Sequence, residues 1–267
     1  MTVNRKAKGD YAIGAVSNAT RLLQVFREVD EIGVAELARR LGLHKNNVFR
    51  LLATLEEAGF IEQNAETGRY RLGLACHFLG QAFGRSRPLL ERALPVLDLL
   101  LEHTGETIHL AVRDGFEVVH LLARVPERQI VVSPRLGQRA PLHCTALGKV
   151  LLGCAPERLW REFDERCAPK GKLPRLTQRG IESRDEFFEH LNKVSGLGWA
   201  TDVGEFEDGL GCAAAPVYDA DGELVAALSV SAPLFRLGDP EGGCAEAIRT
   251  QVVEAAGDLS AALGYVP

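Results

Sequence analysis

Residues 33–60, GVAELARRLGLHKNNVFRLLATLEEAGF, predict two short amphipathic helices joined by a Leu-Gly-Leu turn at 41–43. Each helix has apolar residues at the i, i+3, i+4, i+7 spacing of one buried face: Val34, Leu37, Ala38 and Leu41, then Val48, Leu51, Leu52 and Leu55. Gly59 ends the second helix. Two helices joined by a short glycine turn, the second exposed and polar, are typical of a helix-turn-helix.

The opening turn of the second helix is basic and polar, and it points away from the apolar face. Its side chains are His44, Lys45, Asn46, Asn47 and Arg50. Cations can contact phosphates, and amide groups can hydrogen-bond base edges in a major groove. We therefore predict that this helix binds DNA. The alternative is an αα-hairpin whose charged face is only solvated.

The next segment, FIEQNAETGRYRLG, predicts a β-hairpin with a turn over residues 64–68. A hairpin directly after a recognition helix is a wing, which can lie along the adjacent minor groove or the backbone. Arg69 and Arg71 are its predicted DNA contacts.

The charge of the chain is divided between its two ends. The formal net charge is −5, yet residues 1–90 hold 13 Lys and Arg against 9 Asp and Glu, and the remainder holds 18 against 27. A basic N-terminal module on an acidic body fits phosphate attraction that is confined to one end.

The six cysteines are scattered without a C-x-x-C pair, which favours reduced thiols over a disulfide framework or a zinc site. The basic first ten residues precede no apolar stretch, and no run reaches the roughly 18–20 apolar residues that span a bilayer. We therefore expect a cytoplasmic protein with no membrane partner, no cofactor, no metal and no catalytic residues. A bound metal stays open as an alternative because of four histidines, His103, His109, His120 and His143.

Three regions are predicted along the chain: a winged helix-turn-helix domain over 14–73, a linker and dimerisation helix over 74–87, and a second domain over 88–267. An apolar stripe at helical spacing in the linker favours packing on a partner. It consists of Leu74, Phe78, Leu79 and Phe83.

The second domain is predicted to be α+β, an antiparallel sheet with helices packed on it. Its predicted strands are 107–112, 117–125, 130–132, 199–203, 212–218 and 223–232. Its predicted helices are 88–103 with a kink or break at Pro95, 146–152 with Thr145 as N-cap, 156–166, 183–194 and 239–263. In the first domain, Ser17 is the predicted N-cap of a helix over 19–29.

Two stretches of the second domain predict a ligand site. The first is the turn at 143–148, where free backbone N–H groups and the dipole of the following helix favour a carboxylate. The second is a pair of strands in which Ser229 and Ser231 face one side, while Leu228 and Val230 face the other.

Two further residues fit a cavity for a small organic acid. Cys212 adds a soft polar atom to a wall of alanines, and Asp202 can accept a hydrogen bond from a ligand hydroxyl. The alternative is that the serines lie on an exposed strand face and that Cys212 is a small buried hydrophobe.

The sequence resembles the isocitrate-lyase-regulator (IclR) family of bacterial transcription factors from about Ser17 to Gly264. In the first domain the resemblance rests on VAELARRLGL (34–43), RLLATLEEAGFIE (50–62) and YRLG (70–73). In the second it rests on PLHCTALGKVLL (141–152), GLGCAAAPV (209–217) and ALSVSAP (227–233).

The resemblance implies a winged helix-turn-helix that a linker helix joins to a GAF-like effector domain. It also implies dimers that often pair into tetramers, and control by small metabolites, commonly carboxylic or aromatic acids. The implied effector contacts are Val132, Ala146, Leu147, Asp202, Leu210, Cys212, Ser229 and Ser231. The recognition helix departs from the family pattern, since His44 and Asn46-Asn47 stand where relatives often have Pro or Ser followed by Ser or Thr.

Two other classes of protein stay open. Cys212, His143 and Asp202 form a cysteine–histidine–carboxylate set in an enzyme interpretation, although Cys212 lies within a strand among alanines. In the other, the second domain is an assembly surface without a ligand, and a collapsed cavity beneath the two serines would favour it.

Overall fold

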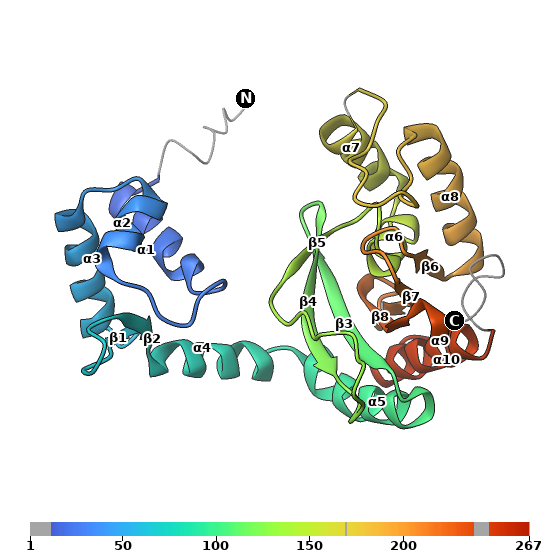
Figure 1. Ribbon diagram of the computed structural model, residues 1–267. Coiled ribbons are helices and arrows are strands. Elements are labelled where there is room, and N and C mark those ends of the chain that lie inside the picture. The colour runs from blue at the N-terminus through green and yellow to red at the C-terminus, as the bar shows by residue number, and fades with distance from the viewer. Residues whose placement is uncertain (1–11, 169, 238–245, 267) are drawn as a thin grey trace, which may run out of the picture. The chain divides into compact units, whose positions relative to one another are not determined.

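The computed structural model describes residues 12–168, 170–237 and 246–266 (Figure 1). The chain divides into two compact units, Met1–Ser86 and Arg87–Pro267. Within the described ranges, no helix combines the length and the apolar character needed to cross a membrane.

The first unit contains a helical module followed by a hairpin, as the sequence predicts. Its elements are α1 (Gly14–Val25), α2 (Val34–Leu41), α3 (Lys45–Glu57), β1 (Ile61–Gln63) and β2 (Tyr70–Leu72). Between α2 and α3, Gly42 has a φ of 66°, a left-handed conformation that glycine adopts without a steric cost. β1 and β2 pair antiparallel. The predicted helix-turn-helix and wing are therefore confirmed.

Helix α1 begins earlier than predicted. Ile13 is its N-cap, and the amide of Ser17 donates to the carbonyl of Ile13 at 3.0 Å. Ser17 thus lies inside the helix, and its prediction as the N-cap is wrong because the helix starts on a backbone hydrogen bond without a side-chain cap. Leu22, the buried residue of α1, packs in the core of the unit with Leu37 and Leu52.

Helix α4 (Leu74–Arg85) has no buried residue. The predicted apolar stripe lies on its surface, and each of its members is exposed in this chain: Leu74, Phe78, Leu79 and Phe83. Apolar side chains gathered at this density on an exposed helix are typical of an interaction surface.

The second unit is built on an antiparallel sheet. Six strands of the described residues form it in the order β5-β4-β3-β8-β7-β6. They are β3 (Thr107–Asp114), β4 (Glu117–Arg124), β5 (Arg139–Pro141), β6 (Ala200–Val203), β7 (Leu210–Tyr218) and β8 (Leu224–Pro233). The helices are α5 (Pro88–Thr104), α6 (Ala146–Gly153), α7 (Glu157–Cys167), α8 (Arg184–Leu197), α9 (Leu234–Leu237) and α10 (Glu246–Ala262).

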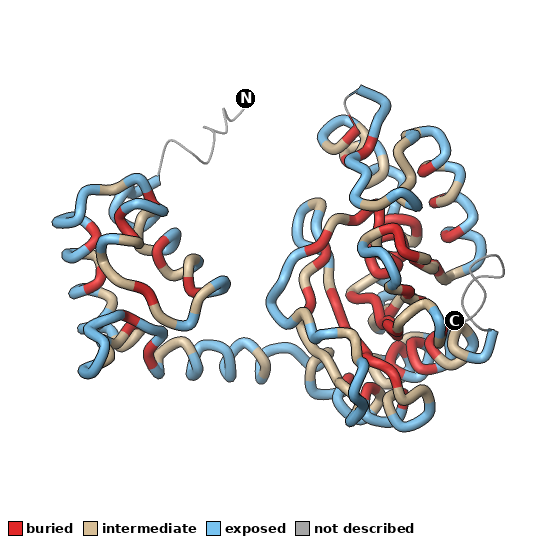
Figure 2. Tube along the Cα trace, in the orientation of Figure 1, coloured by how far each residue is buried: buried red, intermediate tan, exposed pale blue. Residues whose placement is uncertain are grey.

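Helices cover both faces of this sheet (Figure 1). On one face, α5 and α10 pack against the side chains of Leu228, Val230 and their neighbours. On the other face, α6, α7 and α8 form a second core with Ala214 and Ala227. Figure 2 shows the buried residues concentrated along the strands and on the helix sides that face them. The predicted α+β architecture is confirmed.

One predicted feature of the second unit, a strand at 130–132, is wrong, and of the two outcomes predicted at Pro95, a kink or a break, the break does not occur. Residues 130–132 are not a strand, because the carbonyls of Ile130 and Val132 accept hydrogen bonds from the side chains of Arg236 and Thr107 instead of a neighbouring strand. Pro95 does not break α5, since the helix continues to Thr104 with Pro95 on its exposed side and Leu97 in the core. Residues 239–245 of the predicted last helix lie outside the described residues.

Helix α6 is the most enclosed element of the unit, with all its residues buried. The predicted N-cap is confirmed: Thr145 Oγ1 accepts from the amide of Gly148 at 3.0 Å and donates to the carbonyl of Pro141 at 2.9 Å. Gly148 also allows the first turn to approach the chain at Leu142, since a Cβ at this position would lie 2.4 Å from the carbonyl oxygen of Leu142. This contact fixes where the helix begins.

We expect Gly148→Ala to lower the free energy of unfolding by about 1–3 kcal/mol, because the added methyl group forces apart two buried backbone segments. Gly257→Ala is the matched control, because a Cβ at this exposed position of α10 would meet nothing within 4 Å. This variant should raise the free energy of unfolding by at most about 1 kcal/mol through helix propensity. Chemical denaturation measures both. Equal stability of the two variants would contradict the close approach at α6.

Candidate functional site

The strand register gathers polar side chains in rows across the sheet. Asp202 of β6 pairs with Cys212 of β7, Cys212 with Ser231 of β8, and Ser231 with Thr107 of β3. Ser229 pairs in the same way with His109, on the next row along. Because residues directly opposite one another point to the same face, these side chains share one side of the sheet.

The start of α6 faces these rows. Ala146 and Leu147 are in its first turn, and both border a cavity together with the polar residues of the sheet. The first backbone N–H groups of a helix have no partner inside the helix, and they carry its positive dipole end. The cavity therefore combines a small-residue wall, hydroxyl groups and a helix N-terminus.

The structure brings all the predicted effector contacts to this one cavity. They are Val132, Ala146, Leu147, Asp202, Leu210, Cys212, Ser229 and Ser231. The other lining residues are His109, His120, Arg135, Ala140, Thr145 and Phe206. The free volume is about 30 Å³, the space of about one water molecule, so this closed form has no room for an organic acid.

Two polar atoms of the residues that line the cavity make no hydrogen bond within the described part of the chain. They are Ser229 Oγ and His109 Nε2, and both residues are buried. An unsatisfied buried polar atom costs about 1–3 kcal/mol, and each such atom in a native protein calls for an explanation. A ligand with a donor and an acceptor would satisfy both.

The two histidines of the cavity lie edge to face, with ring centres 5.2 Å apart. Burial, followed by the nearby His120 and Arg135, lowers the pKa of His109 to about 3. Burial also lowers the pKa of His120, although the ring faces the carbonyl of Gln138 at 3.3 Å. Both rings are therefore neutral at physiological pH and act as hydrogen-bonding groups.

A cluster of charged side chains lies beside the cavity. Lys149, on the buried helix α6, pairs with Glu205 at 2.5 Å. Asp202 Oδ1 accepts from the amides of Glu205 at 2.7 Å and Phe206 at 3.4 Å. Burial, followed by the negative charge of Glu205, raises the pKa of Asp202 to about 7. Asp202 can thus accept or donate a hydrogen bond near neutral pH.

Several of these groups have no direct signal in the amino-acid sequence. Arg135 and Phe206 come from loops, and Lys149 looks like an ordinary exposed residue in its local sequence. A known strand order would have placed His109 beside Ser229, because β3 pairs with β8. His120 reaches the same face through an irregular register between Leu110 and Ala111.

The cysteine–histidine–carboxylate set is not supported by the hydrogen bonds of the structure. Cys212 Sγ donates to Ser231 Oγ at 3.1 Å, and His143 Nε2 faces the carbonyl of Pro174 at 2.7 Å. Burial lowers the pKa of His143, which weakens it as a base. Across the described residues, no group of three or more His, Cys, Asp or Glu side chains is arranged to hold a metal ion.

The predicted DNA-binding residues lie on α3 and on the wing. His44 is the N-cap of α3, and the side chains of Lys45, Asn46, Asn47 and Arg50 in its first turns are exposed. Arg69 and Arg71 are exposed on the hairpin, where Arg71 pairs with Glu62 at 2.6 Å.

The sequence interpretation missed Phe49 on α3. Its side chain is 58% exposed, among the polar residues of the recognition helix. An apolar side chain is by itself expected to be buried. The helical spacing could have predicted its exposure, because Phe49 does not lie on the face of α3 that buries Val48 and Leu52.

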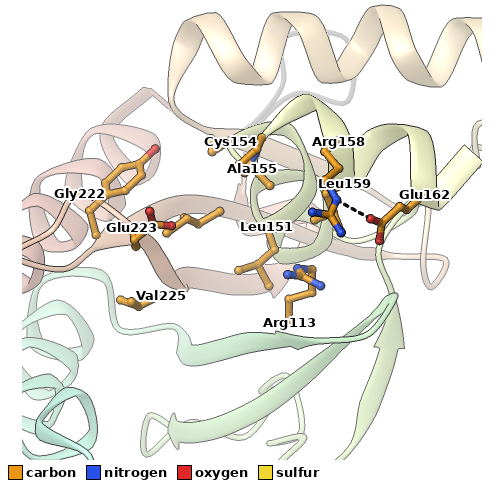
Figure 3. Close-up of a pocket in the computed structure, with 13 residues that line it drawn as sticks. Arg113, Leu151, Cys154, Ala155, Arg158, Leu159, Glu162, Gly222, Glu223 and Val225 are labelled. Atoms are coloured by element: carbon orange, nitrogen blue, oxygen red, sulfur yellow. Dashed lines mark hydrogen bonds and ion pairs between the residues drawn. The ribbon is translucent and has the colours of Figure 1, made fainter. Parts of the chain in front are cut away.

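A larger depression, of about 720 Å³, lies elsewhere on the second unit (Figure 3). Its rim carries Arg113, Cys154, Arg158, Glu162 and Glu223, and Arg158 pairs with Glu162 at 2.9 Å. None of the predicted effector contacts belongs to the described residues that border it. Its size alone therefore does not make it the better candidate, since it lacks the buried polar groups of the smaller cavity.

Family models match both parts of the chain. The one described as "Bacterial transcriptional regulator IclR C-terminal" matches residues 81–261, and the one described as "IclR helix-turn-helix domain" matches residues 15–65. The HTH-type transcriptional regulator XynR of Escherichia coli (strain K12) is 32% identical over 254 residues, covering 95% of this chain and 98% of that protein.

Solved structures share the fold. The crystal structure of an IclR transcriptional regulator from Alicyclobacillus acidocaldarius has a TM-score of 0.82 at 25% identity, covering 95% of this chain and 100% of the other. An IclR homolog from Microbacterium hydrocarbonoxydans, complexed with 4-hydroxybenzoate, has a TM-score of 0.81 at 22% identity, covering 94% and 99%.

The raised pKa of Asp202 gives a test of the cavity's electrostatics. Between about pH 4 and pH 7 the folded protein keeps a proton that the unfolded chain has lost, so rising pH costs stability in this range. Relative to Asp202→Asn, the wild type should lose up to about 1.4 kcal/mol of unfolding free energy per pH unit. Thermal or chemical unfolding of both proteins from pH 4 to pH 8 measures this difference in the free energy of unfolding.

Asp208→Asn is the control, because this neighbouring carboxylate is exposed. It removes one exposed negative charge close to Asp202 in sequence, and so controls for the change in net charge. A stability difference between the wild type and Asp202→Asn that is constant across the range would contradict the raised pKa.

Proposed function

The chain belongs to the IclR family of bacterial transcriptional regulators, and we propose that a small organic acid controls it by binding in the cavity between α6 and the sheet. The DNA-binding unit is the winged helix-turn-helix. The observation that carries the proposal is the convergence of α6 and the six described strands of the sheet on one cavity, two of whose lining residues have an unsatisfied polar atom.

The chemistry of the cavity favours an acid with a polar substituent. The first turn of α6 offers N–H groups to a carboxylate, and Ser229 and His109 offer hydrogen bonds to a hydroxyl or keto group. Aromatic acids are included because Phe206 and the two histidines supply flat surfaces. The 4-hydroxybenzoate bound to the Microbacterium homolog belongs to this class.

We propose a homodimer or homotetramer in which α4 is the linker and the dimerisation helix. The exposed apolar stripe on α4 supports this, because two copies would bury it against each other. Binding of the effector would then change the spacing or the rigidity of the paired winged domains. The regulator works in the cytoplasm without catalysis or a cofactor.

A second candidate is a DNA-binding protein whose second unit serves only for assembly. The free volume of about 30 Å³ favours it, because a collapsed cavity is what a domain without a ligand would show. The buried atoms Ser229 Oγ and His109 Nε2 favour the effector instead, since a permanently closed assembly domain gains nothing from leaving them unsatisfied.

Thermal unfolding against a panel of aliphatic and aromatic carboxylic acids decides between the two. An acid present at about 100 times its Kd should stabilise the domain that it binds by roughly 2.7 kcal/mol. The double variant Ser229→Ala/Ser231→Ala should lose this shift, and the same acid should change the affinity of the wild type for operator DNA. If no acid raises the unfolding temperature, the result supports the interpretation of the second unit as an assembly domain.

Lys45→Ala and Arg50→Ala should each weaken operator binding, because both side chains are exposed at the start of the recognition helix. If the lost contact is to a phosphate, the loss should be similar for all DNA sequences, and the salt slope should fall by about 1. Fluorescence anisotropy across a salt series measures it.

Arg161→Ala is the control for this series, because it removes one positive charge from an exposed position on α7. Its operator affinity and salt slope should equal those of the wild type. An unchanged slope in both recognition-helix variants would argue against this placement of the phosphate contacts.

A further inference from the structure

Among the described residues that line the cavity between α6 and the sheet, Arg135 is the one fixed positive charge. Lys149 is also near, but its ammonium group is engaged by Glu205. The two histidines of the lining are neutral, as shown by their lowered pKa values. An acid that enters the cavity therefore finds one side chain with an opposite charge.

In the closed form, the guanidinium group of Arg135 is held at the edge of the cavity by two contacts. Nη2 donates to Glu207 Oε2 at 2.6 Å, and the group lies 4.8 Å from the centre of the Phe206 ring. The side chain of Glu207 is 60% exposed, and such solvent-exposed ion pairs contribute little stability. Arg135 can therefore leave Glu207 at a small cost.

The backbone at Arg135 is fixed independently of its side chain. The carbonyl of Arg135 accepts from the amide of Gln138 at 2.9 Å, which closes a turn. The same turn is joined to β4, because the amide of Gly137 donates to the carbonyl of His120 at 2.9 Å and the amide of His120 donates back to Gln138 at 3.2 Å. The guanidinium group can thus change partner while the loop keeps its position.

Some lining residue has to move before a ligand can enter, since the free volume is about 30 Å³ and ligand cavities are typically at least about 300 Å³. Three of the lining residues are held in place by hydrogen bonds. Asp202 accepts two backbone amides, the carbonyl of Val132 is bound by Thr107, and Thr145 caps α6. Arg135 and Phe206 are only partly buried, both line the cavity from loops, and their side chains contact each other.

We propose that Arg135 is the counter-ion of the effector's carboxylate, and that it exchanges Glu207 for the ligand as its guanidinium group turns from the Phe206 ring into the cavity. This inference rests on the proposed function, because it assumes an effector in this cavity. It adds a specificity-determining residue from outside the sheet and α6. It also assigns Glu207 as the competitor that holds the site closed.

The test compares carboxylates with their neutral carboxamides on the full-length protein by isothermal titration calorimetry. The probes are benzoate and benzamide, 4-hydroxybenzoate and 4-hydroxybenzamide, and pyruvate and pyruvamide. The wild type should bind at least one acid about tenfold more tightly than its amide, as expected for a charge-assisted hydrogen bond. Arg135→Gln should lose this preference while keeping the affinity for the amide, and Arg135→Lys should restore part of it.

Glu207→Gln should bind the same acid several-fold more tightly than the wild type, because Arg135 no longer has a competing carboxylate. Asp208→Asn, the adjacent exposed carboxylate, is the matched control and should leave the affinity unchanged. If an acid binds the wild type and Arg135→Gln equally, the role of Arg135 is overturned and the effector site stands. If none of the acids binds the wild type, both this inference and the proposed acid effector fail.

Discussion

The antiparallel pairing of β3 with β8 is the constraint on which the second unit depends. It joins residues 107–111 to residues 227–231, which lie at opposite ends of the unit in sequence. Its register decides that Ser229 and Ser231 face the cavity while Leu228 and Val230 enter the core under α5 and α10. A slip of one residue would exchange these two sets, removing the hydroxyl groups from the site and apolar surface from the core.

The core on the cavity side contains a buried ion pair, and this pair holds a loop in place. Lys149 is fully buried on α6, and its ion pair with Glu205 anchors the segment that also carries Phe206 and Glu207. A buried ion pair is a weak contributor to stability, because desolvation opposes the attraction of the charges. Its role here is positional. The pair joins α6, whose first turn borders the cavity, to the loop that carries the lining residue Phe206.

Local rules of sequence predicted the elements whose causes are local. The apolar spacing at Val48 and Leu52, the turn at Gly42 and the Thr145 cap each act within a few residues, and each appears as expected. The prediction failed where a distant group took over the backbone. Residues 130–132 have the composition of a strand, but Arg236 and Thr107 bind their carbonyls, and neither side chain is near them in sequence.

The sequence by itself determined the winged helix-turn-helix, the antiparallel α+β domain and the face of β8 that carries the serines, because helical and strand periodicity record which side of an element is apolar. The resemblance to a family named the effector contacts, and the strand register places them in one cavity. Only the tertiary structure decided that His109, Arg135 and Phe206 join them, that two polar atoms there stay unsatisfied, and that the cavity is closed. Those properties depend on distances between segments far apart in the chain, which no local pattern of residues encodes.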